Sequence, residues 1–114
     1  MKKPITLAEL QAFIKEIDYK PKQKNRYVLK LMEEVGELAD VIRRNQRYTK
    51  KSDSIKGTIE EELYDVLYYL AAIANVYDIE LDDCVIAKET YNGNLPVKKK
   101  KKKKPQSPKN PDPR

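Results

Sequence analysis

The stretch KQKNRYVLKLMEEVGELADVIRR, residues 22–44, decides the fold because its apolar residues recur at intervals of three and four. That spacing places them on one side of an α-helix of about six turns. Pro21 suits the start of a helix, and Arg43 and Arg44 stand where the helix dipole favours cations. We therefore predict a helix over about residues 22–44, with these apolar positions: Val28, Leu31, Met32, Val35, Leu38, Ala39 and Ile42.

Capping boxes mark the start of two further helices. Thr6 is followed three residues later by Glu9, and Thr58 by Glu61, and apolar residues at helical spacing follow each pair. Another apolar segment ends at Gly93, a residue suited to the position after a helix C-terminus. No segment shows the alternation typical of a strand. We predict an all-α helical bundle of about four helices, at residues 7–18, 22–44, 59–76 and 80–92, with a loop over residues 45–57.

Composition excludes several kinds of chemistry. The 114 residues include no His and a single Cys, so a Ser/His/Asp triad, a Cys/His couple, a disulfide within the chain and a Cys/His zinc site are all excluded. The three glycines lie too far apart to form a phosphate-binding loop. The longest stretch without charge, between Asp65 and Asp78, is shorter than the roughly 20 residues of a membrane span. We expect no membrane span, no signal peptide and a cytoplasmic location.

The basic character of the chain belongs to its end. Residues 98–114 hold nine of the 24 basic residues and one of the 18 acidic ones, so they carry +8 while residues 1–97 carry about −2. The segment has seven consecutive lysines, four prolines and no apolar residue, and such a composition cannot form a core. We therefore expect one folded domain, residues 1–97, and a disordered Lys/Pro-rich tail, residues 98–114.

The apolar arc of the 22–44 helix is wide for a small domain. Leu29 and Val41 extend it well beyond the central residues, which are Leu31, Val35, Leu38 and Ile42. A wide apolar arc needs a partner surface. We expect a homo-oligomer in which this helix and the 59–76 helix pack against copies of themselves.

Four carboxylates lie at the edges of the apolar faces of these two helices. Glu34 and Glu37 form an i,i+3 pair on one helix, and Glu62 and Asp65 form another on the second. Four carboxylates near an apolar surface repel one another unless a cation is present. Hard oxygen ligands of this kind suit Mg²⁺ or Mn²⁺.

Each acid taken singly has an ordinary explanation. Glu60, Glu61 and Glu62 stand in the first turn of a helix, where the dipole favours acids. Lys30 can pair with Glu33 or Glu34 on its own helix. The joint pattern of two pairs, each at an apolar edge, favours the metal site.

At these residues the sequence resembles the MazG-like, all-α nucleoside triphosphate pyrophosphohydrolase superfamily. The motif EExxE of that superfamily stands here as EEVGE, residues 33–37, and its ExxD as ELYD, residues 62–65. A third element, KxxxN, stands as KETYN, residues 88–92. The resemblance covers about residues 25–95, and the three motifs in this order are specific.

The resemblance implies an α-helical bundle assembled as a homodimer or homotetramer. It implies Mg²⁺-dependent hydrolysis of a nucleoside triphosphate between the α and β phosphates, giving a monophosphate and pyrophosphate, with Mn²⁺ as a substitute metal and house-cleaning of the nucleotide pool as the role. The ligands would be Glu34, Glu37, Glu62 and Asp65. Glu33 and Glu34 are the candidate catalytic residues, with Glu33 holding a further metal or orienting the attacking water. Substrate contacts would come from Lys88, Asn92 and Tyr69.

Two features leave room for other conclusions. Members of the superfamily that select pyrimidines often use a His and a Trp near the N-terminus, and this chain has neither residue type, so base specificity cannot be carried over. An alternative function is a helical nucleic-acid-binding or regulatory interaction module acting through the lysines of residues 98–114, which would bind phosphates non-specifically. The absence of aromatic residues from that segment argues against recognition of bases.

Overall fold

The computed structural model describes residues 3–97, which form helices joined by turns and loops. The α-helices are α1 (Leu7–Ile17), α2 (Lys24–Arg44), α3 (Ile59–Val76) and α4 (Leu81–Tyr91), and a short 3₁₀-helix, η1 (Pro21–Gln23), precedes α2. The prediction of an all-α fold with four helices is confirmed, and each predicted boundary is met within two residues. The predicted tail, residues 98–114, lies outside the described residues.

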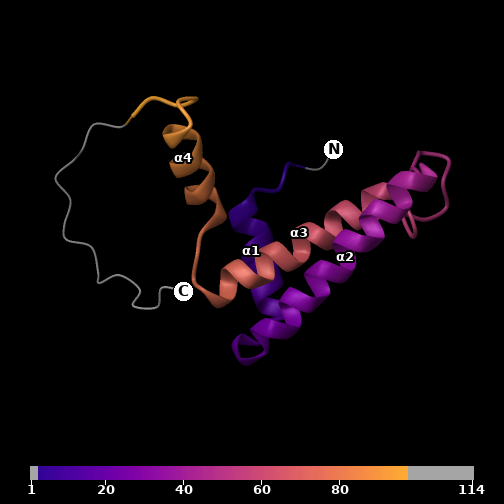
Figure 1. Ribbon diagram of the computed structural model, residues 1–114, viewed down its shortest axis with the longest axis horizontal. Coiled ribbons are helices and arrows are strands. Elements are labelled where there is room, and N and C mark those ends of the chain that lie inside the picture. Colours follow the sequence, from indigo (N-terminus) through magenta and orange to yellow (C-terminus); the bar gives the residue numbers. More distant parts are fainter. Residues whose placement is uncertain (1–2, 98–114) are drawn as a thin grey trace. The chain divides into compact units, whose positions relative to one another are not determined.

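Helices α2 and α3 form the centre of the fold and run side by side in opposite directions (Figure 1). The loop between them returns the chain at one end of the pair, where the Ile59 amide donates to the Gln46 carbonyl at 2.8 Å. Asn45 closes α2 in the left-handed conformation (φ 53°), as helix C-terminal residues often do. The antiparallel pairing brings the middle of α2 opposite the first turns of α3.

The two predicted capping boxes differ in the structure. The box of α1 is complete, since Thr6 accepts from the Glu9 amide and the Glu9 carboxylate accepts from the Thr6 amide. At α3, Thr58 accepts from the Glu61 amide, but the Glu61 carboxylate accepts from the Gly57 amide at 2.6 Å. In this second box the Glu61 carboxylate therefore binds the amide of the residue before the N-cap and not that of the N-cap itself. This hydrogen bond also holds the turn that precedes the helix.

The hydrophobic core lies where α1 crosses the far ends of α2 and α3. Its fully buried members are Ile14, Tyr27, Ala71 and Ala72. The small side chains of α3 at this point let α1 approach closely, so that Ile14 loses all solvent contact.

A buried amide pair fastens α1 to the end of α3. The Gln11 amide donates to the Asn75 side-chain oxygen at 3.1 Å, and the Asn75 amide donates to the Gln11 carbonyl at 3.0 Å. Gln11 also accepts from the backbone amide of Leu81 at 2.9 Å. Every polar group of this pair is thus satisfied inside the fold, as buried polar groups require.

The side of α2 that meets α3 coincides only in part with the predicted apolar arc. The residues of α2 that lose solvent along this contact are Tyr27, Leu31, Glu34, Leu38 and Val41. The matching row on α3 is Thr58, Glu62, Asp65, Tyr69 and Ala72. Both rows follow the alternating spacing of four and three that pairs antiparallel helices. The carboxylates therefore stand within the α2–α3 contact, and Glu62, at 6% exposure, lies inside it rather than at its edge.

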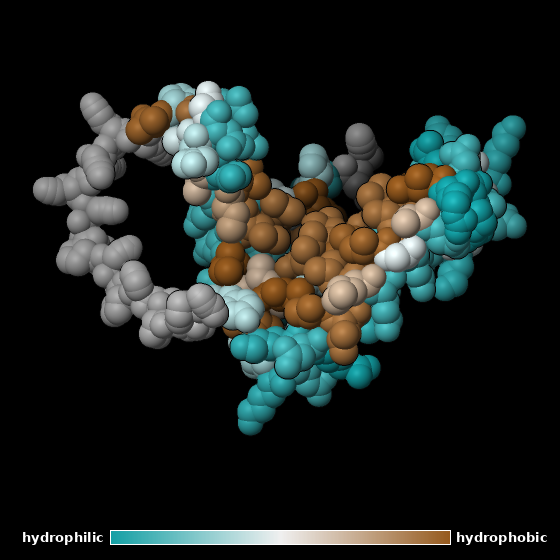
Figure 2. All heavy atoms as spheres, viewed as in Figure 1, coloured by the Kyte–Doolittle hydropathy of each residue, from teal (hydrophilic) through white to brown (hydrophobic). Residues whose placement is uncertain are grey.

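Only part of the predicted apolar arc of α2, namely Leu31, Leu38 and Val41, meets α3, and the rest of it is exposed. Leu29, Met32, Val35 and Ile42 are 49–64% exposed, whereas Val41, predicted at the flank, is buried. Figure 2 shows apolar side chains gathered on the molecular surface over α2 and α3, with hydrophilic residues at the loop end. The sequence correctly identified a wide apolar surface on α2, and within one chain part of this surface is uncovered.

The described residues fall into two compact units, one ending at Cys84 and the other beginning at Val85. The second unit contains most of α4, and its Gly93 adopts the left-handed conformation (φ 86°) expected after a helix. No helix among residues 3–97 combines the length and the hydropathy that crossing a bilayer requires.

Candidate metal centre

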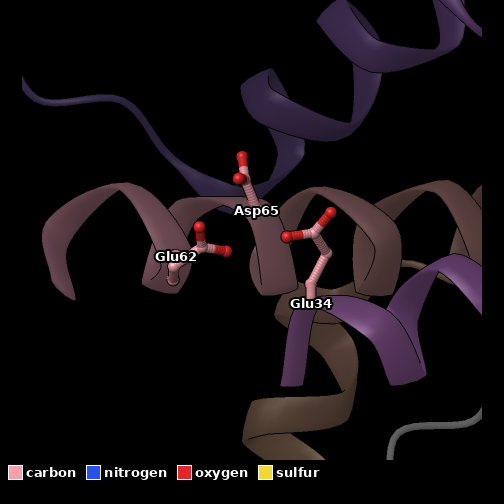
Figure 3. Close-up of side chains that lie close together, drawn as sticks. All are labelled: Glu34, Glu62 and Asp65. Carbon is pink, nitrogen blue, oxygen red and sulfur yellow. The ribbon is translucent and has the colours of Figure 1, made fainter. Parts of the chain in front are cut away.

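Three carboxylates meet where α2 and α3 pair. Glu34 reaches from α2 toward Glu62 and Asp65 on α3, as Figure 3 shows, and one oxygen of each lies within 4.8 Å of the others. The antiparallel arrangement is what brings them together, because Glu34 is separated from the other two by the whole loop. Three of the four predicted metal ligands thus form one cluster.

Glu62 is the most deeply placed of the three. It is 6% exposed, and its Oε1 is buried without any hydrogen-bond partner among the described residues. Burial, together with the neighbouring Glu34 carboxylate and the charges of Asp65 and Glu37, raises the pKa of Glu62 to about 8. An acid that is buried, unpartnered and surrounded by like charge is costly to the fold unless a cation completes its surroundings.

Asp65 feels the same surroundings to a smaller degree. Burial raises its pKa, and the charges of Glu34 and Glu61 add to the rise. The charge of Lys56 opposes it. Lys56 is therefore close enough to act on the cluster, although it stands in the loop before α3 and no sequence motif pointed to it.

The cluster fits a divalent cation of the hard class. Mg²⁺ binds oxygens at about 2.1 Å in an octahedron, so that opposite ligands lie about 4 Å apart. The spread of the three carboxylate oxygens, within 4.8 Å, is compatible with such a geometry after small side-chain adjustments. The buried, unpartnered Oε1 of Glu62 gives the cation a ready ligand atom. With no thiolate or imidazole in the cluster, the donor set favours Mg²⁺ or Mn²⁺ over softer metals.

Glu37 lies beside the cluster but outside it. Its side chain is exposed, and it lines a pocket of about 320 Å³ that we call the loop-side pocket. Other residues of this pocket include Val41, Arg44, Lys56, Glu61 and Glu62. Glu62 belongs both to the cluster and to the pocket. A phosphate or second cation bound in this pocket would therefore lie between Glu37 and a cation held by the cluster.

Glu33 does not belong to the carboxylate cluster. It is exposed and forms an ion pair with Lys30 at 3.2 Å on its own helix. This is the ordinary pairing that the sequence offered as an alternative for this residue. A role for Glu33 at the reacting phosphate would require it to leave Lys30.

Tyr69 lies one helical turn beyond Asp65 and lines a second pocket, of about 380 Å³, which we call the tyrosine pocket. Its walls include Asp18, Lys20, Arg26, Tyr27, Lys30 and Tyr69. The rings of Tyr27 and Tyr69 stand 6.3 Å apart, and Tyr69 also packs edge-on against Tyr68 at 4.9 Å. Tyr69 therefore contributes to the core and to a polar pocket at once.

Asp18 organises one wall of the tyrosine pocket. It accepts hydrogen bonds from the hydroxyls of Tyr27 at 2.8 Å and Tyr68 at 2.6 Å. Burial alone would raise the pKa of Asp18, but these hydrogen bonds and Lys20 outweigh burial and hold it below its usual range. Asp18 is thus an ionised group at neutral pH, and no motif in the sequence had singled it out.

Lys88 and Asn92 belong to the second unit. Both are exposed there; the Lys88 ammonium stands over the ring of Tyr91 at 5.1 Å, and Asn92 caps the end of α4 through its amide to the Lys88 carbonyl. Their contact with substrate remains a prediction.

Comparison with known proteins identifies the family. Residues 22–91 match the family described as MazG nucleotide pyrophosphohydrolase domain. The chain belongs to the MazG family. The matched segment contains α2, α3 and α4, and with them every predicted site residue except Asn92, which directly follows it.

Solved structures agree with this membership. A C-terminally tagged iMazG from Vibrio DAT 722 superposes on this MazG chain with a TM-score of 0.73 and 46% sequence identity, covering 78% of this chain and 99% of the other. An N-terminally tagged crystal structure of the same protein gives a TM-score of 0.72 at 46% identity, covering 77% and 94%. No curated protein matches the chain. Membership in the MazG family places this chain among the hydrolases that act on nucleotides.

Proposed function

We propose that this MazG chain hydrolyses nucleoside triphosphates between the α and β phosphates in a Mg²⁺-dependent reaction, with Mn²⁺ as a substitute. The observation that carries the proposal is the cluster of Glu34, Glu62 and Asp65 with the unpartnered Oε1 of Glu62. A cation there would offset the repulsion among the carboxylates and would bind phosphate oxygens at its remaining positions.

The reaction consumes one water. The water oxygen bonds to the α phosphorus while the bond from that phosphorus to the α–β bridging oxygen breaks. The bridging oxygen leaves with pyrophosphate, and the proton lost by the water passes to a base. A cation held by Glu34, Glu62 and Asp65 would neutralise charge on the phosphates and would make the water more acidic. A basic carboxylate next to the site is required, and Glu37, exposed beside Glu62, and Glu33 are the candidates.

The chain's own residues divide the remaining work. Glu34, Glu62 and Asp65 hold the metal, and Glu37 holds a further metal or water. Tyr69, in the wall of the tyrosine pocket, contacts the nucleoside. Lys88 and Asn92 contact phosphate and sugar, as in the motif that they match. We place this activity in the cytoplasm, where nucleoside triphosphates are made, and assign it to house-cleaning of the nucleotide pool.

Assembly is a further part of the proposal. The exposed apolar arc of α2, with Leu29 at 61% and Met32 at 64% exposure, is larger than scattered surface residues would give. We propose that a second copy of the chain covers it, in a homodimer or homotetramer. Burial of this arc would stabilise the assembly and support the α2–α3 pair that carries the metal site.

Non-specific contact with nucleic acid through residues 98–114 is proposed separately and rests on their charge alone. Binding of this kind weakens steeply as salt increases. Deletion of residues 98–114 should remove it and leave hydrolysis of free nucleotides unchanged.

The deciding experiment measures pyrophosphate release from a panel of standard and modified ribo- and deoxyribonucleoside triphosphates with Mg²⁺, Mn²⁺ or EDTA. The Asp65→Asn variant should lose at least about 100-fold in activity, since a metal ligand contributes several kcal/mol to the transition state. Glu16→Gln is the control, because Glu16 is an exposed acid of α1 that lines neither the loop-side pocket nor the tyrosine pocket. Full metal-dependent activity in the Asp65→Asn variant would show that the assigned site is wrong.

A further inference from the structure

Lys56 faces the metal cluster from the loop before α3. It lines the loop-side pocket together with Glu37 and with Glu62, which is both a member of the cluster and nine-tenths buried. No motif of the family includes this position, which lies six residues before Glu62. The loop-side pocket therefore combines two cationic side chains, Lys56 and Arg44, with Glu62 of the cluster and an open volume of about 320 Å³.

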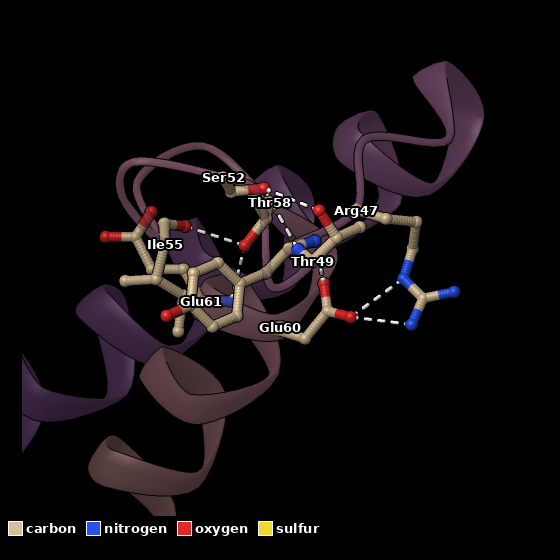
Figure 4. A network of polar contacts seen from close by, with 8 residues as sticks. Arg47, Thr49, Ser52, Ile55, Thr58, Glu60 and Glu61 are labelled. Carbon is tan, nitrogen blue, oxygen red and sulfur yellow. Dashed lines mark hydrogen bonds and ion pairs between the residues drawn. The ribbon is translucent and has the colours of Figure 1, made fainter.

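The backbone around Lys56 is fixed. Gly57 takes the left-handed conformation (φ 77°), which a side chain would strain, and its amide donates to the Glu61 carboxylate at 2.6 Å. On the other side of Lys56, the Thr58 hydroxyl donates to the Ile55 carbonyl at 2.6 Å, a bond visible in Figure 4. These two hydrogen bonds join the turn to the first turn of α3, so Lys56 is presented from a rigid support.

The ammonium group of Lys56 is not occupied by an ion pair with the described residues. Three other cations of the α2–α3 pair and its loop are already paired: Arg44 with Asp40 at 2.9 Å, Lys30 with Glu33 at 3.2 Å and Arg47 with Glu60 at 2.6 Å. Among residues 3–97, Lys56 forms no ion pair within 4.0 Å. An unpaired ammonium beside an acidic metal site is suited to bind an anion that arrives with the metal.

We propose that Lys56 binds the β and γ phosphates of the substrate, and then the pyrophosphate product, in the loop-side pocket. This inference rests on the proposed function. It also fixes the direction of the substrate along α2 and α3: the pyrophosphate end lies at the loop, the α phosphate at the metal cluster, and the nucleoside toward Tyr69.

The lining of the two pockets supports this direction. The walls of the tyrosine pocket include two aromatic rings, Tyr27 and Tyr69, which can stack on a base or sugar. The loop-side pocket has no aromatic residue, and its one large apolar side chain is Val41. Charged side chains line both pockets, so the aromatic rings are what distinguish them, and they favour the tyrosine pocket for the nucleoside.

The test compares the binding of the two products. Titration calorimetry with Mg²⁺ would measure the affinity of the full chain for inorganic pyrophosphate and for a nucleoside monophosphate. The Lys56→Gln variant should bind pyrophosphate about tenfold or more weakly, and the monophosphate within about twofold of wild type. Lys56→Arg keeps the charge and should restore most of the pyrophosphate affinity. Lys51→Gln, an exposed lysine of the same loop outside the pocket, is the matched control and should match wild type.

Two results would overturn the role of Lys56 while leaving the proposed function intact: unchanged pyrophosphate affinity in the Lys56→Gln variant of an active enzyme, or equal losses for both products. A larger loss for the monophosphate would mean that the substrate lies in the opposite direction, and this too overturns the inference. A wild-type chain that neither binds pyrophosphate nor hydrolyses any triphosphate overturns the proposed function and the inference together.

Discussion

Glu62 occupies a position in the α2–α3 contact where antiparallel helices ordinarily place an apolar side chain. Its carboxylate is buried beside Glu34 and Asp65, and one oxygen has no partner among the described residues. Such a residue stabilises the protein only when a cation is present. The proposed metal site would therefore lower the stability of the metal-free protein and raise it on metal binding.

Replacement of Glu62 should separate these two effects. Without metal, the Glu62→Gln variant should melt several degrees above wild type, because an unpaired acid next to two others is removed. Added Mg²⁺ should raise the melting temperature of wild type and leave that of the variant nearly unchanged. Differential scanning fluorimetry with Mg²⁺ or EDTA measures both. An equal Mg²⁺ shift in the two proteins would contradict the assignment of Glu62 as a ligand.

Asp18 predicts a dependence of stability on pH. Its pKa in the folded protein lies below its ordinary value of 3.8, so the fold gains stability from it above that value and loses the gain as the pH falls through the lowered pKa. The Asp18→Asn variant should be less stable at pH 7 by about 1 kcal/mol, because two tyrosine hydroxyls lose a charged acceptor.

Urea unfolding between pH 2 and 7 tests this expectation. The gap between wild type and the Asn variant should be widest at neutral pH and should narrow as the pH falls below 4. Tyr68→Phe, which removes one of the donors to Asp18, should give a smaller loss of the same kind. A gap that stays constant across the pH range would mean that the charge of Asp18 contributes nothing.

At the scale of the elements, the N-cap of α3 stabilises both the helix and the turn before it. Thr58 is 7% exposed, accepts from the Glu61 amide and donates to the Ile55 carbonyl, so it caps α3 and fixes the preceding turn. Thr6 caps α1 by a similar bond at an exposed site. The two caps have the same local chemistry and different tertiary consequences.

The Thr58→Ala and Thr6→Ala variants make a matched pair. Each should lose about 1 kcal/mol of stability through its cap, with Thr58→Ala toward 2 kcal/mol because its buried hydroxyl bond is also lost. Only Thr58→Ala should also weaken Mg²⁺ binding, since Glu62 stands one turn into α3. Denaturant unfolding and Mg²⁺ titration of both variants test this. Equal Mg²⁺ affinity in the two would show that the cap does not position the ligand.

At the scale of the whole molecule, the exposed apolar residues of α2 are the basis for the proposed assembly. Leu29, Met32, Val35 and Ile42 are 49–64% exposed in the single chain, although they belong to the segment with the strongest helical periodicity. The helical periodicity of apolar residues predicts that one face of a helix is buried, but it does not predict which neighbouring element buries that face. In this chain α3 buries only part of the predicted apolar arc of α2.

Sedimentation analysis tests the assembly. Wild type should sediment as a dimer or tetramer, and Met32→Lys should shift it toward smaller species and lower its melting temperature, because a charge replaces part of the apolar contact. Ile5→Lys, a charge placed at another exposed apolar residue (73% exposed) that lies outside the arc, is the control and should leave the assembly intact. A wild-type monomer would contradict the proposal.

The sequence by itself determined the helices, their caps and the residue types available for chemistry. Period and capping act within a few neighbouring residues, so they can be recognised in the chain alone; α3 begins and ends at the predicted residues. The absence of His and the two i,i+3 pairs of acids could also be recognised in the chain alone, and they indicated carboxylate ligands and a hard metal. The motifs from Glu33 to Asp65 were enough to indicate the family.

Only the tertiary structure decided which residues face one another. The rotation of α2 against α3 places Glu34 in the contact, leaves Glu37 beside it and lets Lys30 hold Glu33. Such a rotation is set by packing between elements, as in the core of Ile14, Tyr27, Ala71 and Ala72, and the pattern of one segment carries no such information. Lys56 and Asp18 could not be recognised in advance because their importance comes from what the fold brings near them, which is a property of distance in space and not of spacing in the chain.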